Sequence, residues 1–266
     1  TQRNRLGEFG QKPHNRAARF RKNSIKPGCA INQRLSCAAL FCSVLLISCG
    51  LETFYKIEPP DNADLKNPAD GTTLSVTTTA ETRKYEFSSK NNGGFIAAGT
   101  EVYYRIYNSV EKLQQDARSI NAVNTDIGGN GFAGMERLGY KKLRVHSGGK
   151  NQDLLITGVH RVVIRLADDG ILVGGVFYDG AGSPLFSPVL REGGTQFYFK
   201  TDNQELKPPL SGDTDVDSDE DTGALAGKYW YVNAYAVSVG LVSATWTRSV
   251  SKLLPLGFLA FEKNRS

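Results

Sequence analysis

The order of apolar and polar residues along this chain is mainly that of short β-strands. Residues 100–108, TEVYYRIYN, alternate so that Val102, Tyr104 and Ile106 lie on one face of a strand. Residues 228–239, KYWYVNAYAVSV, alternate in the same way. Similar β-branched or aromatic runs, bounded by Gly, Asp or Pro, predict further strands over residues 74–77, 84–87, 138–146, 159–167, 171–178, 195–200 and 256–262.

One amphipathic helix is predicted over residues 110–122, because apolar residues recur there at helical spacing. Those residues are Val110, Leu113, Ala117 and Ile120. Ser109 precedes them and is a residue type that caps helices. The glycine-rich stretch 128–134 that follows is expected to be a flexible connector. Asp168, Asp169 and Gly170 stand between two predicted strands and indicate a hairpin. Together these elements predict a mainly β, two-sheet antiparallel sandwich with one helix.

One strand resembles a known family. The segment 229–237, YWYVNAYAV, is similar to the penultimate strand of fibronectin type III and related immunoglobulin-like domains. The resemblance implies a sandwich of that kind. Because the chain from Thr73 onward is about twice as long as one such module, the sandwich is expected to be elaborated.

An apolar run near the start of the chain has the form of an export signal. Residues 35–49, LSCAALFCSVLLISC, follow a basic segment and end in a small residue and a cysteine. The run is too short to span a bilayer, which takes about 20 apolar residues. Leu46, Ile47, Ser48 and Cys49 resemble the lipobox of bacterial lipoproteins, and the wider residue pattern resembles spirochaetal lipoproteins. The resemblance implies cleavage before Cys49, acylation of its thiol and anchoring to a membrane of the cell envelope.

Charge and cysteine content both change at the proposed cut. Residues 1–48 hold nine Lys and Arg against one Glu, which leaves 23 basic and 26 acidic residues downstream. The mature chain is thus mildly acidic, and nucleic acid is not expected as a partner. All four cysteines lie at or before position 49. The predicted organisation is a leader over 1–48, a Pro-rich tether over 49–72, and a β-sandwich over 73–266 with an acidic loop at 208–224.

The acidic loop contains an aspartate at every second position. Such runs are typically solvated, mobile loops, because like charges repel. The alternative is a weak Ca²⁺ site, since Ca²⁺ takes six to eight oxygen ligands. The spacing departs from the EF-hand loop, which needs a glycine at its sixth position. Apart from this Ca²⁺, no cofactor is expected. The candidate ligands are Asp213, Asp215, Asp217, Asp219 and Asp221.

Tyrosines form the other candidate site. A rim of exposed tyrosines recognises sugars or proteins, whereas alternating tyrosines in strands more often pack in the core. The candidates for a protein or glycan ligand are Tyr103, Tyr107, Tyr229 and Tyr231.

The sequence carries no convincing catalytic motif. His146 and His160 are the histidines of the mature chain, and nothing sets them at the spacing of metal ligands. The expected function is therefore a non-enzymatic binding or structural role at the bacterial envelope, facing the periplasm or the exterior. The alternatives are a Ca²⁺-dependent adhesin or ligand-binding module, and an envelope hydrolase whose site the sequence does not reveal.

Overall fold

The described residues form part of one compact unit. Contacts divide the chain into Thr1–Thr53 and Phe54–Ser266, and every described residue belongs to the second unit. The predicted leader, the predicted lipidation residue Cys49 and the predicted strand 74–77 lie outside the described residues. The computed structural model describes residues 56–64, 83–125, 129–166, 175–179, 184–197, 208–223 and 226–263.

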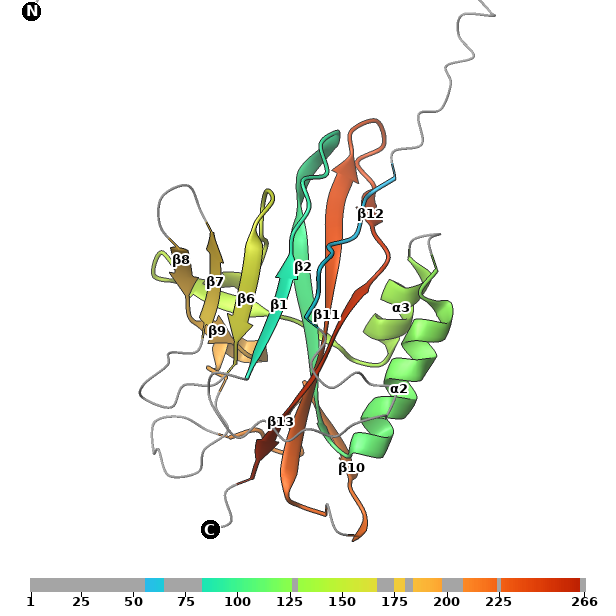
Figure 1. Ribbon diagram of the computed structural model, residues 1–266, viewed down its shortest axis with the longest axis vertical. Helices are drawn as coiled ribbons and strands as arrows, with labels where there is room; N and C mark the ends of the chain where they lie inside the picture. The colour runs from blue at the N-terminus through green and yellow to red at the C-terminus, as the bar shows by residue number, and fades with distance from the viewer. Residues whose placement is uncertain are drawn as a thin grey trace, which may run out of the picture. The chain divides into compact units, whose positions relative to one another are not determined.

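The protein is mainly β, and its largest sheet is built on two long strands (Figure 1). β2 (Phe95–Asn108) and β11 (Tyr229–Val242) have 14 residues each. They pair antiparallel, with Tyr104 opposite Ala234. Four shorter strands complete this sheet: β12 (Arg248–Val250) and β13 (Leu254–Glu262) pair with β11, while β3 (Lys141–Lys142) and the parallel β10 (Val216–Glu220) pair with β2.

Two smaller antiparallel sheets accompany it. One has the order β1 (Lys84–Ser88), β6 (Arg161–Arg165), β7 (Gly175–Asp179) and β8 (Pro184–Ser187). The other has the order β5 (Lys150–Asp153), β4 (Arg144–Ser147) and β9 (Val189–Leu190). β6 and β7 pair as expected of a hairpin, although residues 168–170 lie outside the described residues. The predicted strand 138–146 is divided between β3 and β4.

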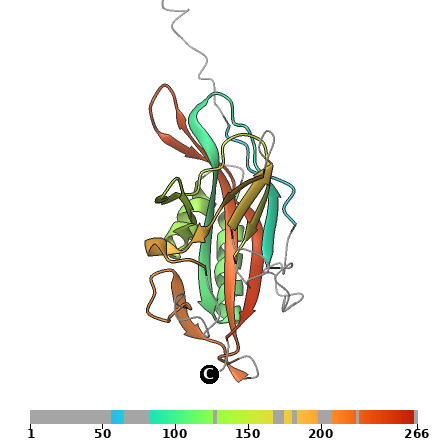
Figure 2. The same ribbon diagram turned by 90° about the vertical axis from the view of Figure 1, so that its left-hand side faces the viewer.

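The β2–β11 sheet lies between a layer of strands and a layer of helices. One face packs on the β1–β6–β7–β8 sheet, which confirms the predicted sandwich. The opposite face packs on α2 (Val110–Val123) and α3 (Asn130–Arg137), and Figure 2 shows the helices behind the strands. Alternation along β2 sends Tyr104 into the first core and Tyr103 into the second. The long strands β2 and β11 carry apolar residues on both faces, since each face of their sheet is buried against another layer.

The helix layer contains one predicted helix and one that differs from expectation. α2 begins where predicted, and Ser109 Oγ accepts a hydrogen bond from the Lys112 amide at 3.2 Å. The glycine-rich stretch is not a connector, because its residues form α3. This helix buries Phe132 and Met135, and the Phe132 ring meets Tyr103 edge-on at 5.3 Å between centroids. Burial of these side chains outweighs the low helix propensity of glycine.

Part of the predicted tether also packs on the domain. Residues 56–64 lie beside β1, where Asp61 and Ser88 exchange backbone hydrogen bonds of 3.0 and 2.8 Å. Ile57 is buried. The predicted strand 195–200 is absent over 195–197, which hold only an isolated bridge between Gln196 and Leu190. Among the described residues, no helix is long and apolar enough to cross a membrane.

Candidate functional site

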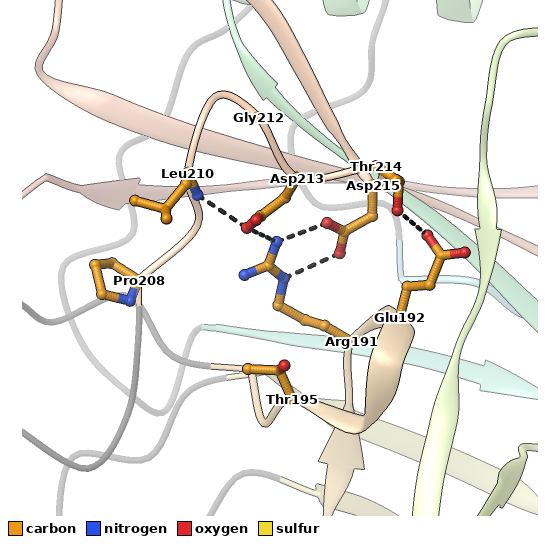
Figure 3. Close-up of a pocket in the computed structure, with 9 residues that line it drawn as sticks. All are labelled: Arg191, Glu192, Thr195, Pro208, Leu210, Gly212, Asp213, Thr214 and Asp215. Carbon is orange, nitrogen blue, oxygen red and sulfur yellow. Dashed lines mark hydrogen bonds and ion pairs between the residues drawn. The ribbon is translucent and has the colours of Figure 1, made fainter.

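A pocket of about 310 Å³ opens between the segment after β9 and the loop before β10 (Figure 3). A short 3-10 helix, Glu192–Gly194, forms one wall. Residues 208–215 form the other. This volume lies at the lower end of the range typical of small-molecule sites. The lining residues are Arg191, Glu192, Thr195, Pro208, Leu210, Gly212, Asp213, Thr214 and Asp215.

Arg191 lies at the centre of the pocket and is 3 % exposed. Its Nε donates to Asp215 Oδ2 at 2.9 Å, and its Nη2 donates to Asp215 Oδ1 at 2.6 Å. Nη2 also donates to Asp213 Oδ2 at 2.7 Å. Two parallel bonds to one carboxylate are the strongest form of an arginine ion pair. The guanidinium plane is therefore fixed.

The elements around the pocket position this ion pair. Asp215 stands directly before β10, and its carbonyl accepts from the Ile106 amide of β2 at 3.0 Å. Tyr104, also on β2, donates its hydroxyl to Asp215 Oδ2 at 2.7 Å. The same hydroxyl accepts from the Glu192 amide at 2.8 Å. One tyrosine thus joins both walls of the pocket to the largest sheet.

The ion pairs control the charge of the pocket. Burial alone would raise the pKa of Asp213, but the Leu210 amide and the Arg191 guanidinium outweigh it and hold that pKa below its ordinary value. The pKa of Glu192 is also lowered, since hydrogen bonds from Thr214 and Lys141 outweigh its burial. These carboxyls are therefore ionised at neutral pH.

One nitrogen of Arg191 remains open toward the pocket. Nε and Nη2 make all the hydrogen bonds that Arg191 donates to described residues. In Figure 3 the third nitrogen, Nη1, has no dashed line and points toward the side where Pro208 and Leu210 lie. A guanidinium nitrogen can only donate, so in an open pocket Nη1 donates to water or to a ligand. An acceptor on a ligand in this pocket would satisfy it.

The acidic stretch is ordered, which contradicts its interpretation as a solvated loop. It leads into β10, and its buried and half-buried carboxylates are paired: Asp213 and Asp215 share Arg191, while Asp217 and Asp221 have other partners. Asp217 forms an ion pair with Arg105 at 2.6 Å. Asp221 accepts from the Val110 amide at the start of α2 at 2.6 Å and from the Tyr231 hydroxyl at 2.7 Å. Asp219 is exposed. In the described part of the chain, no three His, Cys, Asp or Glu side chains gather as metal ligands.

The candidate tyrosines lie mainly inside the molecule. Tyr103, Tyr107 and Tyr231 are at most 4 % exposed and pack beneath the helices. The Tyr107 hydroxyl donates to Asp116 Oδ2 at 3.2 Å, in a buried network with Tyr140. Of the four, Tyr229 alone is partly exposed. They do not form a rim around a ligand.

The two histidines lie apart from the pocket. His146 is on β4, exposed, with its Nδ1 2.7 Å from Asn151 Oδ1. The backbone of His160 bonds to Ser89 beyond the end of β1. Sequence reasoning did not identify Arg191, because a single arginine carries no local motif. The alternating aspartates were the available signal, since a period of two is that of a strand.

Comparisons with protein-family models, with curated proteins and with solved structures found no match for this chain.

Proposed function

We propose that this chain is a lipid-anchored protein of the bacterial envelope with a non-enzymatic binding role, and that the Arg191 pocket holds its ligand. The observation that carries the binding role is the buried guanidinium whose Nη1 faces the pocket without an acceptor among the described residues. The anchor rests on the lipobox that ends in Cys49. A tether of this kind would hold the domain at the membrane surface.

The balance of charge in the pocket favours a neutral ligand. Its lining carries three carboxylates and one guanidinium, and Lys141 forms an ion pair with Glu192 at 3.2 Å. One carboxylate is left in excess, so an anion would be repelled. A hydroxyl group both accepts from Nη1 and donates to a carboxylate. We therefore propose one or two neutral sugar units of a glycan as the ligand.

The same geometry argues against a catalytic role for these groups. A general acid or base needs a pKa near the working pH. The pKa of Asp213 and that of Glu192 are lowered instead. Burial alone would lower the pKa of Arg191, but the hydrogen bonds and charges of Asp215 and Asp213 together outweigh it and raise that pKa. Fixed ion pairs suit recognition better than proton transfer.

Titration calorimetry tests the binding role, with diacetylated chitobiose (called chitobiose below) as the neutral probe and glucuronate as the charged one. We expect the neutral sugar to bind measurably and glucuronate to bind more weakly. Leu210→Glu adds a charge at the mouth of the pocket and should abolish binding. The same substitution at Leu155, an exposed leucine away from the pocket, should not. Absence of heat with chitobiose, or equal effects of both variants, would contradict the sugar assignment.

Metabolic palmitate labelling tests the anchor separately. The wild-type chain should incorporate label, and globomycin should block processing of the acylated precursor. Cys49→Ala should lose the label, while Cys42→Ala, made in the same apolar run, should retain it. Unchanged labelling of the Cys49 variant would overturn the anchor and leave the pocket untouched.

A further inference from the structure

Exposed apolar side chains gather at one end of the domain. Six large hydrophobic residues are exposed in the described part of the chain, and Val123 and Leu210 are two of them. The other four lie around the first residues of β2 and the loops beside it. We call them the apolar end: Ile96 (39 % exposed), Leu155 (40 %), Val159 (65 %) and Trp246 (67 %).

Contacts between neighbouring segments place all four residues at the same end of β2. Ile96 lies at the start of β2, opposite Leu241 of β11. Leu155 lies against Gly99 of β2, where its side chain would meet an added Cβ at 2.6 Å. Val159 precedes β6, next to the bonded pair formed by His160 and Ser89. In both Figure 1 and Figure 2 the β11–β12 hairpin and the β1–β2 loop share the upper end of the domain.

Trp246 is held outward by the hairpin that contains it. Its φ is 55°, in the left-handed region that bulky residues rarely adopt. The backbone fixes this turn, because the amide of Trp246 donates to the Val242 carbonyl at 2.8 Å and the Val242 amide donates to Thr247 at 3.0 Å. An exposed indole on a strained backbone conformation does not stabilise the folded domain. A contact with something outside the domain would give this side chain a role.

The chain that leads from Cys49 enters the domain at this same end. The Glu58 amide donates to Asn92 Oδ1 at 2.7 Å, and the Asn92 amide group returns a bond to the Glu58 carbonyl at 3.1 Å. Asn92 in turn accepts from the Phe95 amide at the start of β2. Six residues separate Cys49 from Lys56, and the seven steps between their Cα atoms span at most about 25 Å. A lipid on Cys49 would therefore keep the apolar end close to the bilayer.

We propose that the apolar end rests on the bilayer surface, with Trp246 inserted at the level of the lipid headgroups. Tryptophan favours this interface because its ring is apolar and its N–H is polar. The inference rests on the proposed acylation of Cys49. It also orients the domain: Ile96 and Tyr104 are eight residues apart on β2, about 26 Å at the rise of a strand. The pocket would then face away from the membrane.

Tryptophan quenching by brominated lipids tests this orientation. The chain has two tryptophans, and Trp230 is buried at 8 % exposure. The full chain, with Cys29, Cys37 and Cys42 changed to Ser, is coupled through Cys49 to a maleimide lipid in phosphatidylcholine and phosphatidylglycerol vesicles. This coupling makes the result independent of acylation in the cell, which palmitate labelling tests.

We expect the emission to shift to the blue and to be quenched by brominated acyl chains. Trp246→Phe should remove the quenched component and leave that of Trp230. Val159→Asn should reduce quenching, whereas Leu210→Asn, at the opposite end of the domain, should not. Unchanged emission on brominated vesicles would overturn the proposal. So would a blue shift that follows protein concentration without lipid, since that would assign the apolar end to a second copy of the chain.

Discussion

Arg191 and Asp215 form a doubly hydrogen-bonded ion pair whose side chains are 4 % and 3 % exposed. The pair joins two segments 24 residues apart, one after β9 and one before β10. Tyr104 of the largest sheet donates to the same carboxylate at 2.7 Å. The same contacts therefore shape the pocket and join its segments to the largest sheet.

Removing the guanidinium should destabilise the whole domain. Arg191→Met leaves Asp215 charged and buried, and breaking such a pair costs about 3–5 kcal/mol. Urea unfolding followed by circular dichroism measures the change. The matched control is Arg161→Met, because Arg161 pairs with Glu86 at 2.8 Å with its side chain 70 % exposed. An exposed pair contributes about 0–1 kcal/mol. Equal losses in the two variants would contradict the assigned role of Arg191.

Acid should weaken the pocket through Asp213. Its folded-state pKa is lowered, so the unfolded chain binds more protons as the pH falls below about 4. The contribution of Asp213 to stability is complete above that pH and is lost as the pH falls through the lowered pKa. Asp213→Asn should therefore flatten the dependence of unfolding free energy on pH below about 4. A variant with the wild-type slope in that window would refute this account.

Two glycines of α3 should respond oppositely to the same substitution. An added Cβ at Gly134 meets only Val123 Cγ2 at 3.5 Å, an ordinary contact. Gly134→Ala should thus stabilise the protein by about 0.5–1 kcal/mol through helix propensity. At Gly131 the Cβ would meet the Asn124 side-chain oxygen at 2.6 Å and its Cα at 3.0 Å. Gly131→Ala should lower the melting temperature, and a rise in both variants would be the contrary result.

The cap of α2 gives a further prediction. Ser109 Oγ accepts from the Lys112 amide at 3.2 Å, and loss of such a cap costs about 0.5–2 kcal/mol. Ser109→Ala should lower the free energy of unfolding by that amount. Ser119 lies on the exposed side of the same helix, and among the described residues its hydroxyl bonds to the Gln115 carbonyl at 2.9 Å. Ser119→Ala should change stability by less than about 0.5 kcal/mol, and thermal unfolding compares the two.

The sequence predicted those elements whose periodicity is carried by apolar residues. Alternation located β2 and β11, and helical spacing with a capping serine located α2. It did not predict α3, because Gly131 and Gly134 give the segment a low helix propensity. The apolar residues Phe132 and Met135 hold this helix on the sheet nonetheless. Local propensity is a weak guide where tertiary packing decides the conformation.

The pocket was harder to predict than the fold. The aspartates of the pocket were visible in the sequence as a run of charge, not as the segment that leads into a strand. Their partners are distant in sequence: Arg191 lies 24 residues from Asp215, and Tyr104 lies 111 residues from it. A pattern along the chain indicates which residues share a face. It does not indicate which arginine will neutralise a carboxylate across two segments.

β10 is the outermost strand of the largest sheet, and this position gives its acidic residues a second consequence. An unprotected edge strand offers free backbone groups on which another chain can extend the sheet. Asp219 and Glu220 are exposed there. A second copy of the chain would have to bring its own β10 against these like charges. The exposed charges of β10 therefore disfavour the pairing of two copies of the chain through this edge.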